Sequence, residues 1–112
     1  MITTYQELHD YLKDGLREDE DGYWTYMVFC TRSNGELCFC IKDVSFSSVY
    51  GVHWSVEPDH PFASVEEDQH NDDPEAWKEQ LRKNLQWMAN ALGKPVVDED
   101  ALDEDIDKMK SK

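Results

Sequence analysis

Asn34 and Gly35 constrain the fold of this chain more than any other residues, because they join two runs of alternating side chains. An Asn-Gly pair favours a type I′ turn, which connects two antiparallel strands through a two-residue loop. A three-residue loop would shift the register by one residue and exchange the faces of the second strand. The two-residue turn predicts these facing pairs: Arg32 and Leu37, Cys30 and Phe39, Val28 and Ile41.

The two faces of the predicted hairpin differ in polarity, because successive side chains of a strand point to opposite sides. One face is apolar and is expected to form the core: Trp24, Tyr26, Val28, Cys30, Leu37, Phe39 and Ile41. The other face is half-polar: Thr25, Met27, Phe29, Thr31, Cys38, Cys40 and Lys42.

Helix signals lie on both sides of the hairpin. Thr4 and Glu7 have the spacing of a capping box, which predicts a helix over residues 5–14. Asp73-Pro74 and Gly93 are start and stop signals that predict a second helix over 74–92. Its apolar stripe is expected to pack on the sheet: Trp77, Leu81, Leu85, Met88 and Leu92. A short third helix is predicted in the tail from the spacing of Leu102, Ile106 and Met109.

The expected fold class is α+β, with a small antiparallel sheet of three or four strands. A third strand is predicted within Val49–Val56, and Phe62–Val65 is a candidate fourth strand at the sheet edge. The helix at 74–92 should cover one face of the sheet, with the N-terminal helix packed beside it. Residues 1–97 are expected to form one domain, followed by an acidic helix or tail over 98–112.

The negative charge is concentrated outside the predicted sheet. The 112 residues carry a net charge of −14, yet residues 23–56 hold two acids and two bases. Residues 57–75 hold eight acids and no Lys or Arg, and residues 98–112 hold seven acids and three lysines. This charge disfavours direct binding to nucleic acid or to an anionic membrane.

The expected location is the cytoplasm. The start, Met1-Ile2-Thr3-Thr4, lacks the basic and apolar stretches of a signal peptide. There is also no run of about 18 apolar residues that would predict a transmembrane helix.

Motifs for catalysis or cofactor binding are weak, so we expect neither an enzyme nor a cofactor. Cys38 and Cys40 form a C-x-C on a strand, which lacks the usual knuckle spacing of structural zinc sites. Ordinary thiols in a reducing compartment explain the cysteines better. His53 and His60, with nearby carboxylates, leave open the alternative of a small metal-dependent enzyme.

The acidic segments are the better candidates for binding a partner. Seven acids within residues 98–107 would, on a helix, place one charge per roughly 2 Å. Duplex DNA carries one per about 1.7 Å, so this surface could compete for a basic groove. The candidate carboxylates are Glu66, Glu67, Asp68, Asp72, Asp73, Glu75, Asp98, Glu99, Asp100, Asp103, Glu104, Asp105 and Asp107. Three aromatic residues outside the expected core, Trp87, Tyr23 and Phe62, are candidate anchors.

In size, charge and compactness the chain is similar to nucleic-acid mimics, namely anti-restriction and anti-CRISPR inhibitors, and to acidic toxin-immunity proteins. That resemblance implies an inhibitor that docks on a basic partner protein, such as a nuclease or a nucleic-acid-binding complex. The alternatives are an immunity protein, the metal-dependent enzyme, or an adaptor whose acidity only keeps it soluble. The chain is expected to be a monomer or a homodimer.

Overall fold

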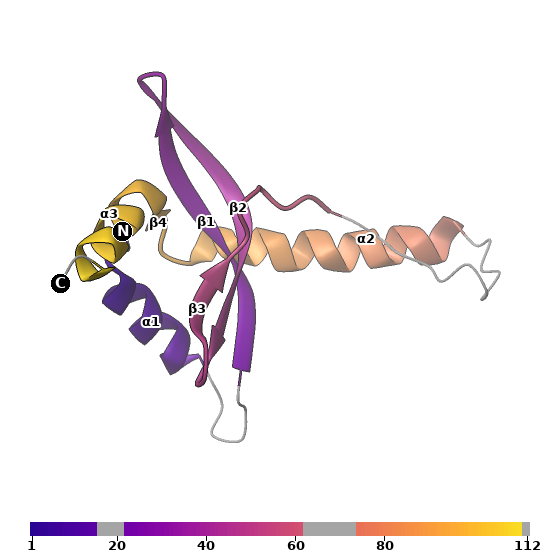
Figure 1. Ribbon diagram of the computed structural model, residues 1–112. Coiled ribbons are helices and arrows are strands. Elements are labelled where there is room, and N and C mark those ends of the chain that lie inside the picture. Colours follow the sequence, from indigo (N-terminus) through magenta and orange to yellow (C-terminus); the bar gives the residue numbers. More distant parts are fainter. Residues whose placement is uncertain (16–21, 62–73, 111–112) are drawn as a thin grey trace.

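The computed structural model describes residues 1–15, 22–61 and 74–110, which form a four-stranded sheet with helices on both faces (Figure 1). The strand order is β3-β2-β1-β4, with β4 parallel to β1 and the other pairs antiparallel. The α+β fold class is confirmed, but the sheet is mixed rather than antiparallel as predicted, because β4 runs parallel to β1. The elements are α1 (Tyr5–Asp14), β1 (Gly22–Ser33), β2 (Glu36–Ser47), β3 (Gly51–Trp54), α2 (Pro74–Ala89), the 3-10 turn η2 (Asn90–Gly93), β4 (Val97–Asp98) and α3 (Glu99–Lys110).

The hairpin of β1 and β2 has the predicted turn and register. Asn34 and Gly35 have φ angles of 52° and 80°, and a type I′ turn requires positive φ at both central residues. Cys30 pairs with Phe39 and Val28 with Ile41, as the two-residue loop demands. The same register continues to the far end of both strands, where Gly22 pairs with Ser47.

The prediction of which hairpin face forms the main core is wrong. Met27 and Phe29 of the half-polar face are fully buried, whereas Trp24 and Phe39 of the apolar face are 52% and 59% exposed. Both faces carry large apolar side chains, so hydrophobicity alone does not decide between them; the helices that cover each face do. The main core joins side chains from the sheet, α1 and α3: Ile2, Leu8, Leu12, Met27, Phe29, Val44, Phe46, Val52, Val97 and Leu102.

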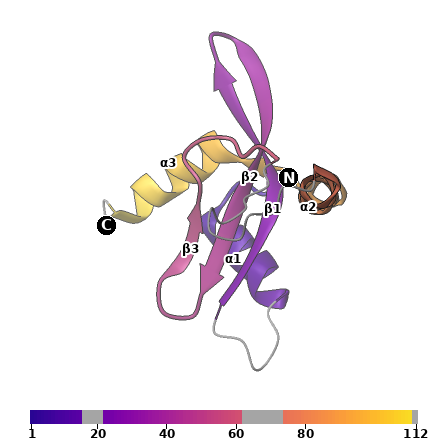
Figure 2. The same ribbon diagram turned by 90° about the vertical axis from the view of Figure 1, so that its right-hand side faces the viewer.

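The helices are divided between the two faces of the sheet, contrary to the prediction that the first two share one face. Figures 1 and 2 show α1 and α3 on one side and α2 on the other. A smaller cluster of Tyr26, Val28, Met88 and Ala91 joins the second face to the end of α2 and to η2.

Most of the apolar stripe of α2 does not pack on the sheet, although the helix itself lies where it was predicted. Met88 is buried, but Trp77 and Leu85 are 39% and 50% exposed, and Leu92 in η2 is 74% exposed. The N-terminal part of α2 projects away from the sheet (Figure 1). None of the helices in the described ranges is long and apolar enough to cross a membrane.

The two ends of the chain meet at β4, an element that the sequence did not predict. Ile2 forms a parallel bridge with Val97, donating its N–H to the Val96 carbonyl at 2.8 Å and accepting from Asp98 N at 2.8 Å. The third strand is shorter than predicted, at Gly51–Trp54, and the candidate strand Phe62–Val65 lies outside the described residues. β4 therefore lies between the N-terminal segment and β1 and pairs with both.

Candidate functional site

Several carboxylates of the acidic block at residues 98–107 accept hydrogen bonds within the fold itself. Asp98 is buried, and its carboxylate accepts a hydrogen bond from Ala101 N at 3.1 Å and one from the Arg32 guanidinium at 3.3 Å. The Ala101 N–H and the Arg32 charge lower the pKa of Asp98. Asp98 thus caps the first turn of α3 and ties it to the hairpin.

Three more carboxylates of this block bond within the protein. Asp100 accepts from Arg32 N at 2.7 Å, and Asp105 accepts from Tyr5 N at 2.9 Å. Glu99 accepts a hydrogen bond from the Lys42 ammonium at 2.9 Å, and this ion pair is largely buried. These bonds account structurally for much of the acid density on α3.

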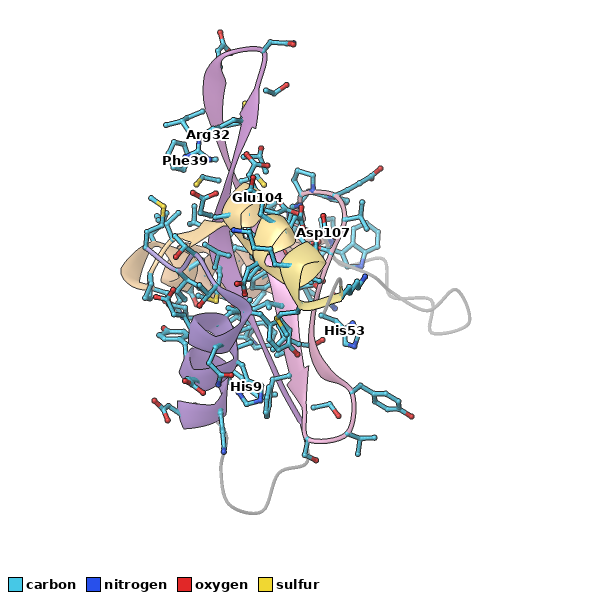
Figure 3. All side chains as sticks on the ribbon, turned by 60° about the vertical axis from the view of Figure 1, so that its left-hand side comes forward. His9, Arg32, Phe39, His53, Glu104 and Asp107 are labelled. Carbon is cyan, nitrogen blue, oxygen red and sulfur yellow. The ribbon has the colours of Figure 1, made fainter. Side chains whose placement is uncertain are left out.

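The remaining acids of the block, Asp103, Glu104 and Asp107, are exposed on α3. Figure 3 shows Glu104 and Asp107 on this helix, well apart from His9 on α1. Partial burial and then the neighbouring Glu99 raise the pKa of Asp103. These three carboxylates contribute negative potential to this side of the molecule.

Of the acidic block at residues 57–75, the structure describes only the two ends. Glu66, Glu67, Asp68, Asp72, Asp73 and the predicted anchor Phe62 lie outside the described residues. Glu75 is in the first turn of α2, with its carboxylate 3.3 Å from Lys78 Nζ. Asp59, at the start of the block, lines a pocket on the α2 side of the sheet.

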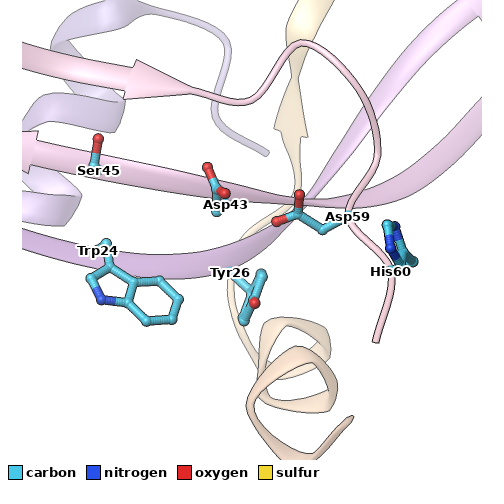
Figure 4. Close-up of a pocket in the computed structure, with 6 residues that line it drawn as sticks. All are labelled: Trp24, Tyr26, Asp43, Ser45, Asp59 and His60. Atoms are coloured by element: carbon cyan, nitrogen blue, oxygen red, sulfur yellow. The ribbon is translucent and has the colours of Figure 1, made fainter. Parts of the chain in front are cut away.

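This pocket is a cavity of about 490 Å³ between the hairpin and the segment that follows β3 (Figure 4). Two backbone hydrogen bonds hold that segment beside β2. Ser55 N donates to the Asp43 carbonyl at 3.1 Å, and Asp59 N donates to the Ile41 carbonyl at 2.9 Å. They bring Asp59 beside Asp43. The pocket is lined by Trp24, Tyr26, Asp43, Ser45, Asp59 and His60.

Asp43 and Asp59 form a carboxyl pair in this pocket. Burial, the charge of Asp59 and a hydrogen bond with Asp59 raise the pKa of Asp43. Neither carboxylate forms an ion pair with a Lys, Arg or His within the part of the chain that the structure describes. The pair therefore has no cationic partner among the described residues.

Exposed tryptophans stand next to the carboxyl pair. Trp24 packs edge-on against Tyr26, with ring centroids 5.4 Å apart, and against Trp87 at 5.9 Å. Trp24 and Trp87 are 52% and 56% exposed. The predicted anchor Trp87 contacts Trp24, which lines the pocket, whereas Tyr23 is half-buried against the main core on the other face.

Sequence reasoning missed Trp24 and Asp43 as site residues, although the hairpin register contained a signal. Continued along both strands, that register pairs Tyr26 with Asp43 and Trp24 with Ser45. Asp43 is one of only two acids in the neutral stretch 23–56, and it falls on an otherwise apolar face. A lone acid opposite an aromatic residue is a feature to examine in similar hairpins.

The metal-site alternative gains no support from the described residues. Cys30 is buried, Cys40 half-buried and Cys38 exposed, and all three are free thiols. Among residues 1–15, 22–61 and 74–110, no group of three or more potential ligands could hold a metal ion. His60 lines the carboxylate pocket, while His53 lines a different one beside α3.

The Asp43→Asn variant is expected to be more stable than the wild-type protein at neutral pH. Because the pKa of Asp43 is raised in the folded state, folding favours its protonated form, and stability falls as pH rises from the unfolded pKa of about 3.9 through the folded value. An asparagine carries no charge, so the gain should vanish below that range. Urea unfolding at pH 7 and pH 3 measures it, with Glu104→Gln on α3 as control; equal gains at both pH values would contradict the assignment.

Comparisons with protein-family models, curated protein sequences and solved structures find no match to this chain, so the proposals that follow rest on its own geometry.

Proposed function

We propose that this protein is an acidic antagonist that binds a basic partner protein and occupies a surface which that partner uses for nucleic acid. The proposal is carried by the Asp43–Asp59 pair, which has no cationic partner among the described residues and lines one pocket with the exposed Trp24, itself in contact with the exposed Trp87. The docking site is the α2-side face around this pocket, which we call the pocket face: Trp24, Tyr26, Asp43, Asp59, His60 and Trp87.

Charge and aromatic side chains have separate roles in this binding. The net charge of −14 steers a basic partner toward the protein and raises the rate of encounter at low salt. Exposed tryptophans supply the apolar contact that holds a complex together, because interface hot spots are enriched in Trp, Tyr and Arg. The pocket face combines both within one site.

The pocket face is a better docking site than the acidic block on α3. Asp98, Glu99, Asp100 and Asp105 already accept hydrogen bonds within the fold, so a partner would have to displace those donors. The exposed carboxylates on α3 strengthen the long-range field. A nuclease, a nucleic-acid-binding complex or a toxin nuclease presents the positive surface that this arrangement suits.

The test compares two variants that remove the same amount of charge. Asp43→Asn/Asp59→Asn neutralises the pocket, and Glu104→Gln/Asp107→Asn neutralises two exposed carboxylates on α3. Each protein is immobilised, and basic proteins from a host extract are captured at about 0.05 M salt, released at about 0.5 M, identified and assayed for nucleic-acid binding.

The wild-type protein and the α3 variant should capture the same basic protein and inhibit its binding to nucleic acid. The pocket variant should lose both effects. Retention of capture and inhibition by the pocket variant, with loss in the α3 variant, would place the docking site on α3 instead. Binding that survives 0.5 M salt in every variant would contradict an electrostatic interface.

A further inference from the structure

We infer that the pocket face receives the guanidinium group of an arginine side chain from its partner, held between the Trp24 ring and the Asp43 and Asp59 carboxylates. The inference rests on the proposed function and specifies the chemistry of the same site. It follows from three properties of the pocket: its charge, its aromatic wall and its size.

The carboxyl pair calls for a ligand that is cationic and carries several hydrogen-bond donors. An ionised carboxylate only accepts hydrogen bonds, and two adjacent carboxylates repel each other unless a proton or a cation lies between them. A guanidinium presents five N–H donors in a planar fork, so it can bond to both carboxylates at once. A lysine ammonium is a compact point charge that cannot span the two in this way.

The aromatic wall favours the same planar cation. The Trp24 ring is half exposed, and its edge-on contacts with Tyr26 and Trp87 leave a surface for a ligand to pack on. Cations bind over the faces of aromatic rings, tryptophan being the strongest, and arginine is found there more often than lysine. Trp87, at an interplanar angle of 77° to Trp24, supports the orientation of that ring.

The size of the pocket leaves room for a whole side chain. A volume of about 490 Å³ lies within the range of sites that enclose small molecules. It can take a guanidinium together with its aliphatic stem, which would lie along the apolar wall. A divalent cation fits less well, because the described residues supply no group of three metal ligands.

The experiment titrates the full-length protein with three blocked tripeptides, in which glycines flank arginine, lysine or uncharged citrulline. Binding is followed by the indole N–H resonances of the tryptophans at about 0.15 M salt. The arginine peptide should shift the Trp24 resonance and saturate at millimolar concentration. The lysine peptide should bind about tenfold more weakly, and the citrulline peptide should cause no shift.

Two variants establish where the peptide binds. Trp24→Leu, followed by the indole resonance of the neighbouring Trp87, should lose the arginine preference. Trp77→Leu removes an exposed tryptophan on the projecting part of α2 and should bind as the wild type does. Asp43→Asn/Asp59→Asn should lose binding while remaining folded, since it removes an unfavourable charge pair. Urea unfolding of the same variant separates a loss of binding from a loss of the fold.

Equal affinity for the arginine and lysine peptides, no saturable binding, or unchanged binding by Trp24→Leu would each overturn the inference. These outcomes are distinct from failure of the proposed function. Capture of a basic partner through the pocket face, without arginine selectivity, would leave the antagonist role standing and remove only the assignment of the guanidinium. Selective binding of the arginine peptide without capture of a partner would support the assignment of the guanidinium and contradict the antagonist role.

Discussion

Replacing Lys42 with methionine is expected to lower the free energy of unfolding by about 3–5 kcal/mol, because it leaves Glu99 as an uncompensated buried charge. The Lys42 and Glu99 side chains are only 5% and 13% exposed. Lys42 Nζ lies 2.9 Å from both Glu99 carboxylate oxygens and 2.9 Å from the Val56 carbonyl oxygen. Trp54 Nε1 also donates to Glu99 at 3.1 Å, so one pair joins β2, β3 and α3.

Urea unfolding followed by tryptophan fluorescence measures this loss at neutral pH. The double variant Lys42→Met/Glu99→Gln should recover part of it, since glutamine carries no charge and still offers Trp54 an acceptor. Lys78→Met breaks an exposed pair with Glu75 on α2 and serves as the matched control, for which little change is expected. A loss below about 1 kcal/mol for Lys42→Met would show that the pair is hydrated rather than buried.

Truncating Leu102 to alanine is expected to cost about 2–5 kcal/mol, which is the range for large-to-small changes in a packed core. Leu102 is fully buried and packs with the main core from α3, whereas Met109 on the same helix is 54% exposed. Met109→Ala should therefore have little effect and controls for the change in helix propensity. Chemical denaturation of both variants provides the comparison.

The stability of Leu102→Ala indicates whether the acidic helix α3 is needed for the fold or supplies only surface charge. If Leu102→Ala is strongly destabilised, a chain that ends at Val97 should fail to fold stably, because it loses both Leu102 and the Glu99 partner of Lys42. If instead the shortened chain keeps the stability of the full chain, α3 is dispensable. In that case its carboxylates could serve only as surface charge.

The parts of the fold that local chemistry determines were predictable from the sequence. The Asn34-Gly35 turn dictates its own φ angles and therefore the register of the whole hairpin. Likewise, Thr4 accepts from Glu7 N at 3.2 Å at the start of α1, as the capping spacing requires. In both cases the residues that decide the structure are neighbours along the chain.

The parts that depend on distant contacts were not predictable. Both hairpin faces are rich in apolar residues, so the buried face is chosen by the two helices that cover it, α1 and α3. Arg32 meets Asp98 and Asp100 only in the folded chain, and no pattern in the sequence distinguishes those acids from the exposed Glu104. For the candidate site, the sequence offered Trp87 as an anchor, but Asp43 and Asp59 were not among the predicted binding residues and Trp24 was assigned to the core.

The bridge between Ile2 and Val97 has a kinetic consequence. The β1–β2 hairpin contains only local pairs and can form early, whereas the contacts of Phe29 with Val97 and of Ile2 with Val96 close almost the entire chain into a loop. During synthesis, Ile2 must wait for Val96 and Val97 before it can pair. The core should therefore be completed in one late step, and a chain stalled before Val97 would still expose its most apolar surface.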